Sequence, residues 1–472
     1  MAQSRRDFLR NSACALGSMA LASTVETLGL VNAYAQSASD YRALVCIFLS
    51  GGNDCNNMIV DLNQFTSYNN VRNASGLAIP QGNLLQISPL SGGSYGLHPM
   101  LPELRTLFNQ SNSPLAIVAN VGPLVEPLTR TTYQNGTGKK PLQLFSHSDQ
   151  VGLWQSSVAD SVVQTGWGGR IADKTGSLNG AATFPQMTSI AGISLFVTGA
   201  TARPLAIGDS NTALSAVLPL NNPPGSSGFT NAQNTARRTA FDQINVLDPG
   251  VTLIKASASV RSSALQTQAA LASVNPAIAT VFPNTTLGRQ LLQVARVIKA
   301  SIDPTAGINM KRQIFFCNLG GFDTHSNQTS ATFTGGQGNL LQQLSQAMNA
   351  FYAATVELGV GPNVTTFTLS DFGRTLSPSG AGVAAVGSDH GWGNHHFVMG
   401  GSVIGGRLYG TYPTLALSGP DDTDSRGRWI PTTAVEQYAA TLANWYGLSA
   451  SDYPAVFPLL SHFSPSNMGF MM

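Results

Sequence analysis

The chain has 472 residues and a globular composition, with 43% hydrophobic but only 10% charged residues, against about 25% charged in an average protein. The formal net charge is +2, and the sequence holds no basic stripe or acidic tail. The charge pattern is therefore not that of a protein that binds nucleic acid or a charged membrane surface. Length alone suggests roughly three domains, although α/β enzymes often reach this size as one domain.

The amino terminus resembles a twin-arginine signal peptide. The motif Ser-Arg-Arg-Asp-Phe-Leu (residues 4–9) is followed by a modestly apolar stretch (13–31) and a small-residue cleavage pattern at 33–35. The alternative is an amphipathic surface helix. No later run reaches the roughly 18 apolar residues that span a bilayer. We therefore predict a signal peptide over residues 1–35 and an exported mature chain, periplasmic or secreted, without a transmembrane segment.

The cysteines give little information about chemistry. Cys46, Cys55 and Cys317 remain after residue 35, an odd number at wide spacing, which is neither a disulfide framework nor a paired zinc site. Cys46 and Cys317 lie in apolar runs, so we interpret them as small core residues.

The first element after the signal is an unbroken apolar run at residues 43–49, which predicts a strand buried on both faces, as in a parallel sheet. The pattern then predicts a helix at 100–108, a strand at 115–119, a helix opening near Ser146 or Ser148, another at 165–172 and a strand at 193–197.

Periodicity weakens between about residues 202 and 284. Pro-Pro-Gly-Ser-Ser-Gly at 223–228 has linker chemistry, and the Ala/Ser/Gln-rich stretch 255–273 is helical but weakly apolar. We interpret residues 202–284 as a cap insertion in a single α/β domain over residues 40–472.

Regular alternation returns after this segment. Leu287, Leu291, Val294 and Ile298 repeat at helical spacing, followed by a strand at 314–319, a helix at 341–352, a strand at 364–369 and a helix near 433–446. Strands alternating with helices predict a doubly wound α/β fold with a mostly parallel sheet.

Polar side chains follow three of the predicted strands. Asp54 follows the first, Asp323 and His325 follow the strand at 314–319, and Asp371 follows the strand at 364–369. A glycine-rich loop then brings Asp389 and His390, within a stretch that holds three of the seven histidines. Because the carboxyl ends of parallel strands share one edge, these side chains are expected to converge. Mixed carboxylate and imidazole ligands suit zinc or manganese better than calcium. The alternatives are helix N-caps and a solvated loop.

The order of these motifs resembles the exported family called domain of unknown function 1501, which is similar to a branch of the alkaline phosphatase and sulfatase superfamily. The motifs that carry the resemblance lie at residues 51–54 (GGND), 97–99 (LHP), 146–147 (SH), 166–168 (GWG), 320–325 (GGFDTH), 370–375 (SDFGRT), 389–391 (DHG) and 400–401 (GG). The resemblance implies an alkaline phosphatase type of α/β hydrolase with one or two divalent ions.

The implied metal ligands are Asp54, Asp323, His325, Asp371 and His390, with Asp389 as a further candidate. Phe372 stands where two-metal members of the superfamily usually carry a histidine, which leaves a second ion dependent on Asp389, His395 or His396. The resemblance also places a nucleophile at a helix amino terminus, where backbone N–H groups can hold an anionic ester. Ser146 is the candidate, with His147 beside it; a plain helix cap is the alternative.

These observations predict an exported metal-dependent hydrolase of phosphate or sulfate esters, acting on a small anionic ester, with no nucleic-acid partner and with protein partners left open. The first alternative is a non-catalytic exported binding or assembly protein that retains the hydrolase fold. The second is a metal-free serine hydrolase, because residues 92–96 (GGSYG) fit the G-x-S-x-G elbow with Ser94 as nucleophile.

Overall fold

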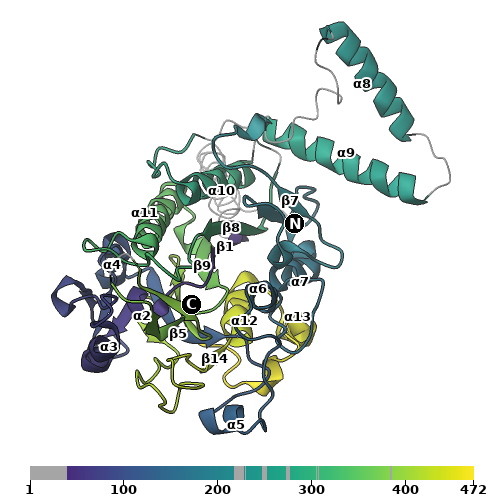
Figure 1. Cartoon of the computed structure of the whole chain (residues 1–472). Coiled ribbons are helices and arrows are strands. Elements are labelled where there is room, and N and C mark those ends of the chain that lie inside the picture. The colour runs from purple at the N-terminus through teal and green to yellow at the C-terminus, as the bar shows by residue number, and fades with distance from the viewer. Residues whose placement is uncertain are drawn as a thin grey trace, which may run out of the picture.

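The computed structural model describes residues 40–472 apart from 217–227, 229, 247–251, 273–276, 305, 307 and 383–384 (Figure 1). The predicted signal peptide (1–35) lies outside the described residues, as do parts of the predicted cap (202–284). Within the described ranges, every helix is too short or too polar to cross a membrane.

A large, mostly parallel sheet forms the centre of the described chain. Its strand order is β13-β5-β12-β9-β1-β8-β6-β7, with β14 also paired to β5. β12 runs antiparallel to both of its neighbours, and the other pairs are parallel. The strands are β1 (Arg42–Ser50), β5 (Leu115–Gly122), β6 (Met187–Ser189), β7 (Pro204–Ala206), β8 (Arg312–Gly320), β9 (Val364–Ser370), β12 (Asn394–Met399), β13 (Leu408–Tyr409) and β14 (Thr433–Ala434).

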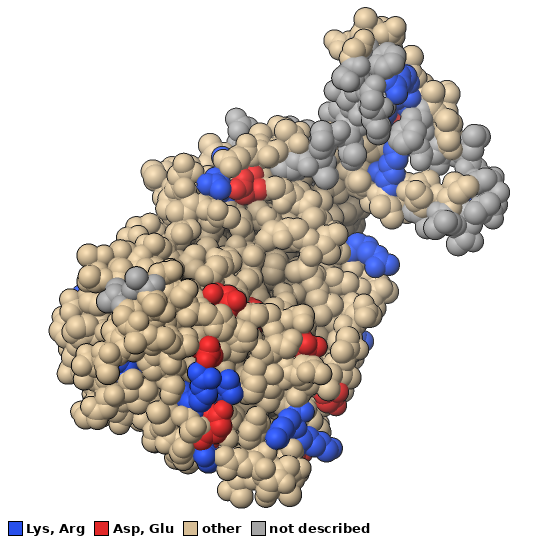
Figure 2. Space-filling view, in the orientation of Figure 1, with Lys and Arg blue, Asp and Glu red and all other residues tan. Residues whose placement is uncertain are grey.

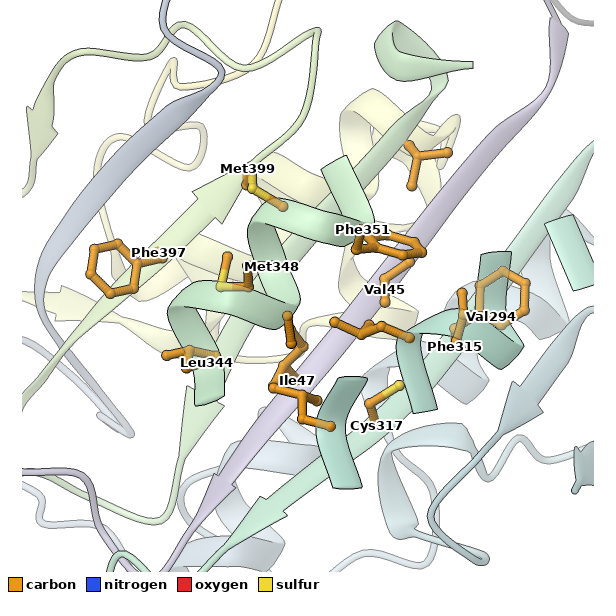
Figure 3. Packing of buried hydrophobic residues seen from close by; sticks show 14 of the residues in the cluster. Val45, Ile47, Val294, Phe315, Cys317, Leu344, Met348, Phe351, Phe397 and Met399 are labelled. Carbon is orange, nitrogen blue, oxygen red and sulfur yellow. The ribbon is translucent and has the colours of Figure 1, made fainter. Parts of the chain in front are cut away.

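One face of the sheet is covered by three helices: α4 (Pro102–Asn109), α10 (Thr286–Ile302) and α11 (Gly336–Glu357). Alternate residues of β1 point to this side, so Val45 and Ile47 pack under Met348 and Phe351 of α11 (Figure 3). Each such fully buried side chain stabilises the fold by about 1.5–3 kcal/mol.

The opposite face is covered by α6 (His147–Ser156), α7 (Trp167–Thr175), α12 (Val435–Tyr446) and α13 (Tyr453–Val456). The intervening β1 residues Leu44, Cys46 and Phe48 point to this side. Because both faces are buried, β1 is apolar at every position between its ends, as the sequence predicts. The doubly wound α/β fold is therefore confirmed.

Smaller elements surround this core. They are α2 (Cys55–Met58), α3 (Phe65–Arg72), α5 (Arg130–Gln134), a three-stranded antiparallel sheet of β2 (Ile59–Asp61), β4 (Tyr95–Leu97) and β3 (Leu85–Ile87), and a two-stranded sheet of β10 (Arg374–Ser379) and β11 (Gly387–His390). α8 (Asn231–Val246) and α9 (Thr252–Ala272) project from the body in Figure 1.

One predicted strand is wrong. Residues 193–197 form a loop that ends in a 3-10 turn, Leu195–Val197, and the sheet is instead extended by the short strands β6 and β7. These three-residue strands are too short to show a periodic hydrophobic pattern, and Pro204 opens the edge strand β7, a position that proline tolerates.

Candidate metal centre

The carboxyl ends of three adjacent strands build one edge of the sheet. β1 lies between β9 and β8, so Gly51 after β1, Asp371 after β9, and Asp323 with His325 after β8 meet at that edge. His147, the first residue of α6, and His390, the last of β11, reach the same place from outside the sheet.

Three imidazoles turn their Nε2 atoms toward one carboxylate oxygen, Oδ1 of Asp323. The distances from this oxygen are 3.0 Å to His325, 3.5 Å to His147 and 3.5 Å to His390. The Nε2 atoms of His325 and His390 lie 3.0 Å apart. Three imidazole nitrogens from distant parts of the chain therefore surround one carboxylate oxygen.

The other ring nitrogen of each imidazole is held by a hydrogen-bond acceptor. Nδ1 of His147 lies 2.7 Å from Asp371 Oδ2, Nδ1 of His325 lies 3.0 Å from Asp389 Oδ1, and Nδ1 of His390 lies 2.7 Å from the carbonyl oxygen of Phe145. A carbonyl only accepts hydrogen bonds, and so does an ionised carboxylate, so each Nδ1 is the donor, and in the neutral imidazole the lone pair is then on Nε2. Histidines that bind metals in proteins are held in this way.

These donors fit a divalent transition metal. His147, Asp323 and His390 each offer one atom within 4.8 Å of the others. Ligands about 2.0–2.1 Å from a tetrahedral ion would lie about 3.3 Å from one another, close to the 3.5 Å separations from Asp323. Nε2 of His147 is buried and has no hydrogen-bond partner among the described residues, a state that costs free energy unless something binds it.

The charge state of the group also suits a cation. Burial raises the pKa of Asp323, but the hydrogen bond and the positive charge of Arg374 are the main effects that oppose this, and the pKa lies below its usual value. Burial raises the pKa of Asp389, and His325 and Arg426 together bring it below its usual value. Burial lowers the pKa of His390, which favours the neutral imidazole that a metal needs.

Phe372 forms the floor of the centre. Its fully buried ring stacks on His390 at 4.6 Å between centroids and contacts His147 at 4.8 Å. The ring therefore fills the space under the two imidazoles.

Arg374 ties the strand ends together. Its buried guanidinium donates to the carbonyls of Gly52 (2.8 Å), Ser388 (2.8 Å) and Phe322 (3.0 Å), as well as to Gly51 and to Asp323 Oδ1. One side chain thus links the loops after β1 and β8 to β11, and fixes Asp323 beneath the imidazoles.

Asp54 is placed elsewhere, in a buried polar network. Its two oxygens accept hydrogen bonds from Nη1 and Nη2 of Arg72 at 2.6 and 3.1 Å, and further bonds from Gln328 and the backbone N–H of Asn56. Asp54 also caps α2. The structure therefore does not bring this carboxylate into the group around Asp323, although the sequence predicted it as a ligand.

The remaining predicted residues lie around the centre in different roles. Asp371 and Asp389 hold the imidazoles rather than joining the converging atoms, and Asp371 Oδ1 also accepts from the backbone N–H of Gly51. Ser146 directly precedes α6, and its hydroxyl lies 2.6 Å from Asp149 Oδ2. His147, predicted beside a nucleophile, is one of the converging imidazoles.

His395 and His396 do not join the group. Both are buried in β12, where burial lowers the pKa of each imidazole to about 3. Nδ1 of His395 accepts from the backbone N–H of Asn120, and Nδ1 of His396 lies 3.2 Å from the hydroxyl of Thr368. They are neutral core histidines.

The serine-elbow alternative is contradicted. Ser94 lies between the antiparallel strands β3 and β4, not on a strand-to-helix turn, and its hydroxyl accepts from the Gln86 side chain at 3.2 Å. The motif is a chance match in a glycine-rich hairpin loop.

Two contributors were missed by the sequence analysis. Phe145 supplies the carbonyl that holds His390, and Arg426 pairs with Asp389 behind His325. No local pattern marks a backbone carbonyl as a partner. Arg426 follows Asp389 by 37 residues, so only the three-dimensional structure shows that the two pair. Charged side chains are sparse on the face shown in Figure 2.

Residues 306–423 match the sequence model of the family described as "Protein of unknown function (DUF1501)". This segment holds Asp323, His325, Asp371, Asp389 and His390, and the matched family is the one that the sequence motifs resemble. Among curated proteins, the sequence has no match.

Distant similarity to solved structures extends over most of the chain. PsFucS1 sulfatase from Pseudoalteromonas sp. is 9% identical, with a TM-score of 0.33 over 95% of this chain and 74% of that chain. The lipoteichoic acid synthase LtaP from Listeria monocytogenes is 6% identical, with a TM-score of 0.34 over 88% and 74%. The C-terminal periplasmic domain of EcEptC from Escherichia coli is 10% identical, with a TM-score of 0.35 over 88% and 84%.

Proposed function

We propose that this protein is an exported, metal-dependent hydrolase of phosphate or sulfate esters, in which His147, Asp323 and His390 hold one divalent cation and His325 lies beside them. One observation carries the proposal: three Nε2 atoms converge on Asp323 Oδ1 while every Nδ1 is held by an acceptor. Without a cation between these donors, their lone pairs would face one another at separations of 3.0–3.5 Å.

Zinc or manganese suits this donor set, since imidazole nitrogen and carboxylate oxygen are their usual ligands. When bound, such an ion polarises an ester oxygen and lowers the pKa of a coordinated water. The site is open to an incoming ester, because the side chains of Asp323 and His325 are 48% and 46% exposed.

The chain's own residues supply the rest of the chemistry. α6 begins at His147, so its free backbone N–H groups and the positive end of its dipole favour an anionic ester at the centre. Ser146 is the proposed nucleophile, and Asp149 Oδ2, 2.6 Å from its hydroxyl, can take up the hydroxyl proton. Arg374 and Asp371 keep Asp323 and His147 in place.

Metal content is the first test. We expect the folded protein to retain close to one equivalent of zinc or manganese by elemental analysis, and the variants D323A and H390A to lose it. H462A is the matched control, because Nδ1 of His462 also bonds to a carbonyl, that of Val125, but outside the centre. Metal retained stoichiometrically by D323A and H390A would remove both residues from the ligand set.

Turnover is the second test. We expect chelator-sensitive hydrolysis of generic phosphate, phosphonate or sulfate esters, with S146A losing activity but keeping the metal. The second candidate function is a non-catalytic exported binding or assembly protein, which the single-cation centre above Phe372 favours. A protein that retains metal but hydrolyses none of these esters would support that candidate.

Export is tested separately. Residues 1–39 lie outside the described part of the chain, so the proposal rests on the twin-arginine motif. Replacement of Arg5 and Arg6 by lysine should retain a reporter fusion in the cytoplasm; export of that variant would contradict the proposed route.

A further inference from the structure

We propose that Phe145 is a positioning residue of the metal centre, which sets two of its histidines through a left-handed backbone conformation. This inference rests on the proposed function. Phe145 has a φ of 73°, in the region that glycine favours. For a bulky aromatic residue this conformation is a genuine outlier, and such strain persists only where the surrounding structure holds it.

The first consequence of this conformation concerns His390. The Phe145 carbonyl oxygen lies 2.7 Å from Nδ1 of His390. Because a carbonyl only accepts, Nδ1 must donate, and the lone pair of the ring is placed on Nε2. That Nε2 lies 3.5 Å from Asp323 Oδ1. The direction of one backbone carbonyl therefore fixes both the tautomer and the orientation of this imidazole.

Arg428 connects the Phe145 ring to the backbone of His390. Its guanidinium carbon lies 4.4 Å from the centroid of the Phe145 ring, and its Nε donates to the carbonyl of His390 at 2.9 Å. Nη1 of Arg428 is in turn held by Asp424 at 3.0 Å. Phe145 is thus linked to His390 in two ways: its carbonyl bonds directly to the imidazole, and its ring packs against Arg428, which bonds to the His390 carbonyl.

The second consequence concerns His147. Phe145 lies two residues before His147, which opens α6. The turn before the helix is tight: Gln143 also has a positive φ of 42°, and the buried side chain of Gln150 donates to the carbonyls of Leu142 (3.1 Å) and Gln143 (3.4 Å). These hydrogen bonds hold the turn against the first turn of α6. The backbone conformation of the turn therefore sets the direction of the His147 side chain.

A pair of substitutions separates the backbone conformation from the ring. Glycine adopts a positive φ freely, so F145G keeps the carbonyl in place and removes only the side chain. Valine is branched at Cβ and strongly disfavours a positive φ, so F145V turns the carbonyl away. L144V is the matched control, because it introduces the same side chain at the neighbouring residue, which does not have a positive φ.

Zinc affinity of the purified full chain, measured by competition with a chromophoric chelator, is the first readout. We expect F145V to bind zinc at least tenfold more weakly than the wild type, in line with the usual effect of losing a partner that orients a ligand. F145G and L144V should stay within threefold, because the carbonyl of residue 145 still accepts from His390 and Asp424 still holds Arg428 in place without the Phe145 ring. The second readout is the ring tautomer of His390 by nitrogen-detected NMR of the metal-free protein: protonated Nδ1 in the wild type, F145G and L144V, and a mixture in F145V.

Folded F145V with wild-type zinc affinity and an unchanged His390 tautomer would overturn the inference. If F145V does not fold, F145A replaces it, because the comparison of F145A with F145G still isolates the Cβ atom. If the wild type binds no zinc, the proposed function fails, while the tautomer in the metal-free variants still decides whether Phe145 positions His390.

Discussion

Glu436 tests whether burial of a carboxyl makes the stability of this protein depend on pH. It lies in the first turn of α12, is 1% exposed, and neither carboxyl oxygen has a hydrogen-bond partner among the described residues. Burial raises the pKa of this carboxyl to about 8, although Arg170 opposes the shift. The perturbation is E436Q, which keeps the shape of the protonated side chain and removes its ionisation.

The sign and size follow from linkage. The unfolded chain has a glutamate pKa of about 4.3, so between that pH and about 8 the folded state keeps a proton that the unfolded state has released. The contribution of Glu436 to the free energy of unfolding is therefore largest below about pH 4.3. It falls by about 1.4 kcal/mol per pH unit as the pH rises toward 8. From pH 5 to pH 7.5 the wild type should lose about 3 kcal/mol that E436Q does not lose.

Urea denaturation of both proteins at pH 5 and pH 7.5 measures this difference. E126Q is the control for a change of one charge, since Glu126 is partly exposed and accepts a hydrogen bond from the backbone N–H of Lys139. The reasoning is refuted if the advantage of E436Q over the wild type grows by less than about 1 kcal/mol between the two pH values, or if E126Q behaves in the same way.

Three further predictions concern the centre and its surroundings. D371N weakens the acceptor for Nδ1 of His147, so zinc affinity by titration calorimetry should fall about tenfold, and an unchanged value would exclude the pairing as a support. D54N leaves Arg72 buried without its charge partner and should cost about 3–5 kcal/mol in urea denaturation, with zinc affinity unchanged; a parallel loss of zinc would return Asp54 to the ligand set. Zinc at about 100 times its dissociation constant should stabilise the wild type by about 2.7 kcal/mol and leave H390A unaffected, and equal stabilisation of both would point to another site.

The sequence predicted the long strands because a strand buried on both faces is rich in apolar and β-branched residues: β1 is an unbroken apolar run, β8 holds the run 314–317, and β9 combines threonines with apolar residues. It could not predict β6 and β7, whose three residues carry no period. The shared edge was also predictable, since parallel strands end on the same side.

The role of each polar residue was less predictable. Whether Asp371 faces a cation or an imidazole depends on a displacement of a few ångströms, and local sequence does not record it. The partner of Asp54 is Arg72, a residue of α3 that the strand pattern does not connect with it. The positive φ of Phe145 contradicts the preference of its residue type, so propensity argues against it.

The pairing of β1 has a consequence for how the chain folds. Its two neighbours, β8 and β9, lie about 270 and 320 residues further along the chain. Such distant partners make folding slow and leave a bare apolar strand exposed to aggregation in the meantime. We expect chains that stop before β9 to be insoluble, and the imidazole cluster to be among the last features to assemble, since β11 and its His390 follow β9.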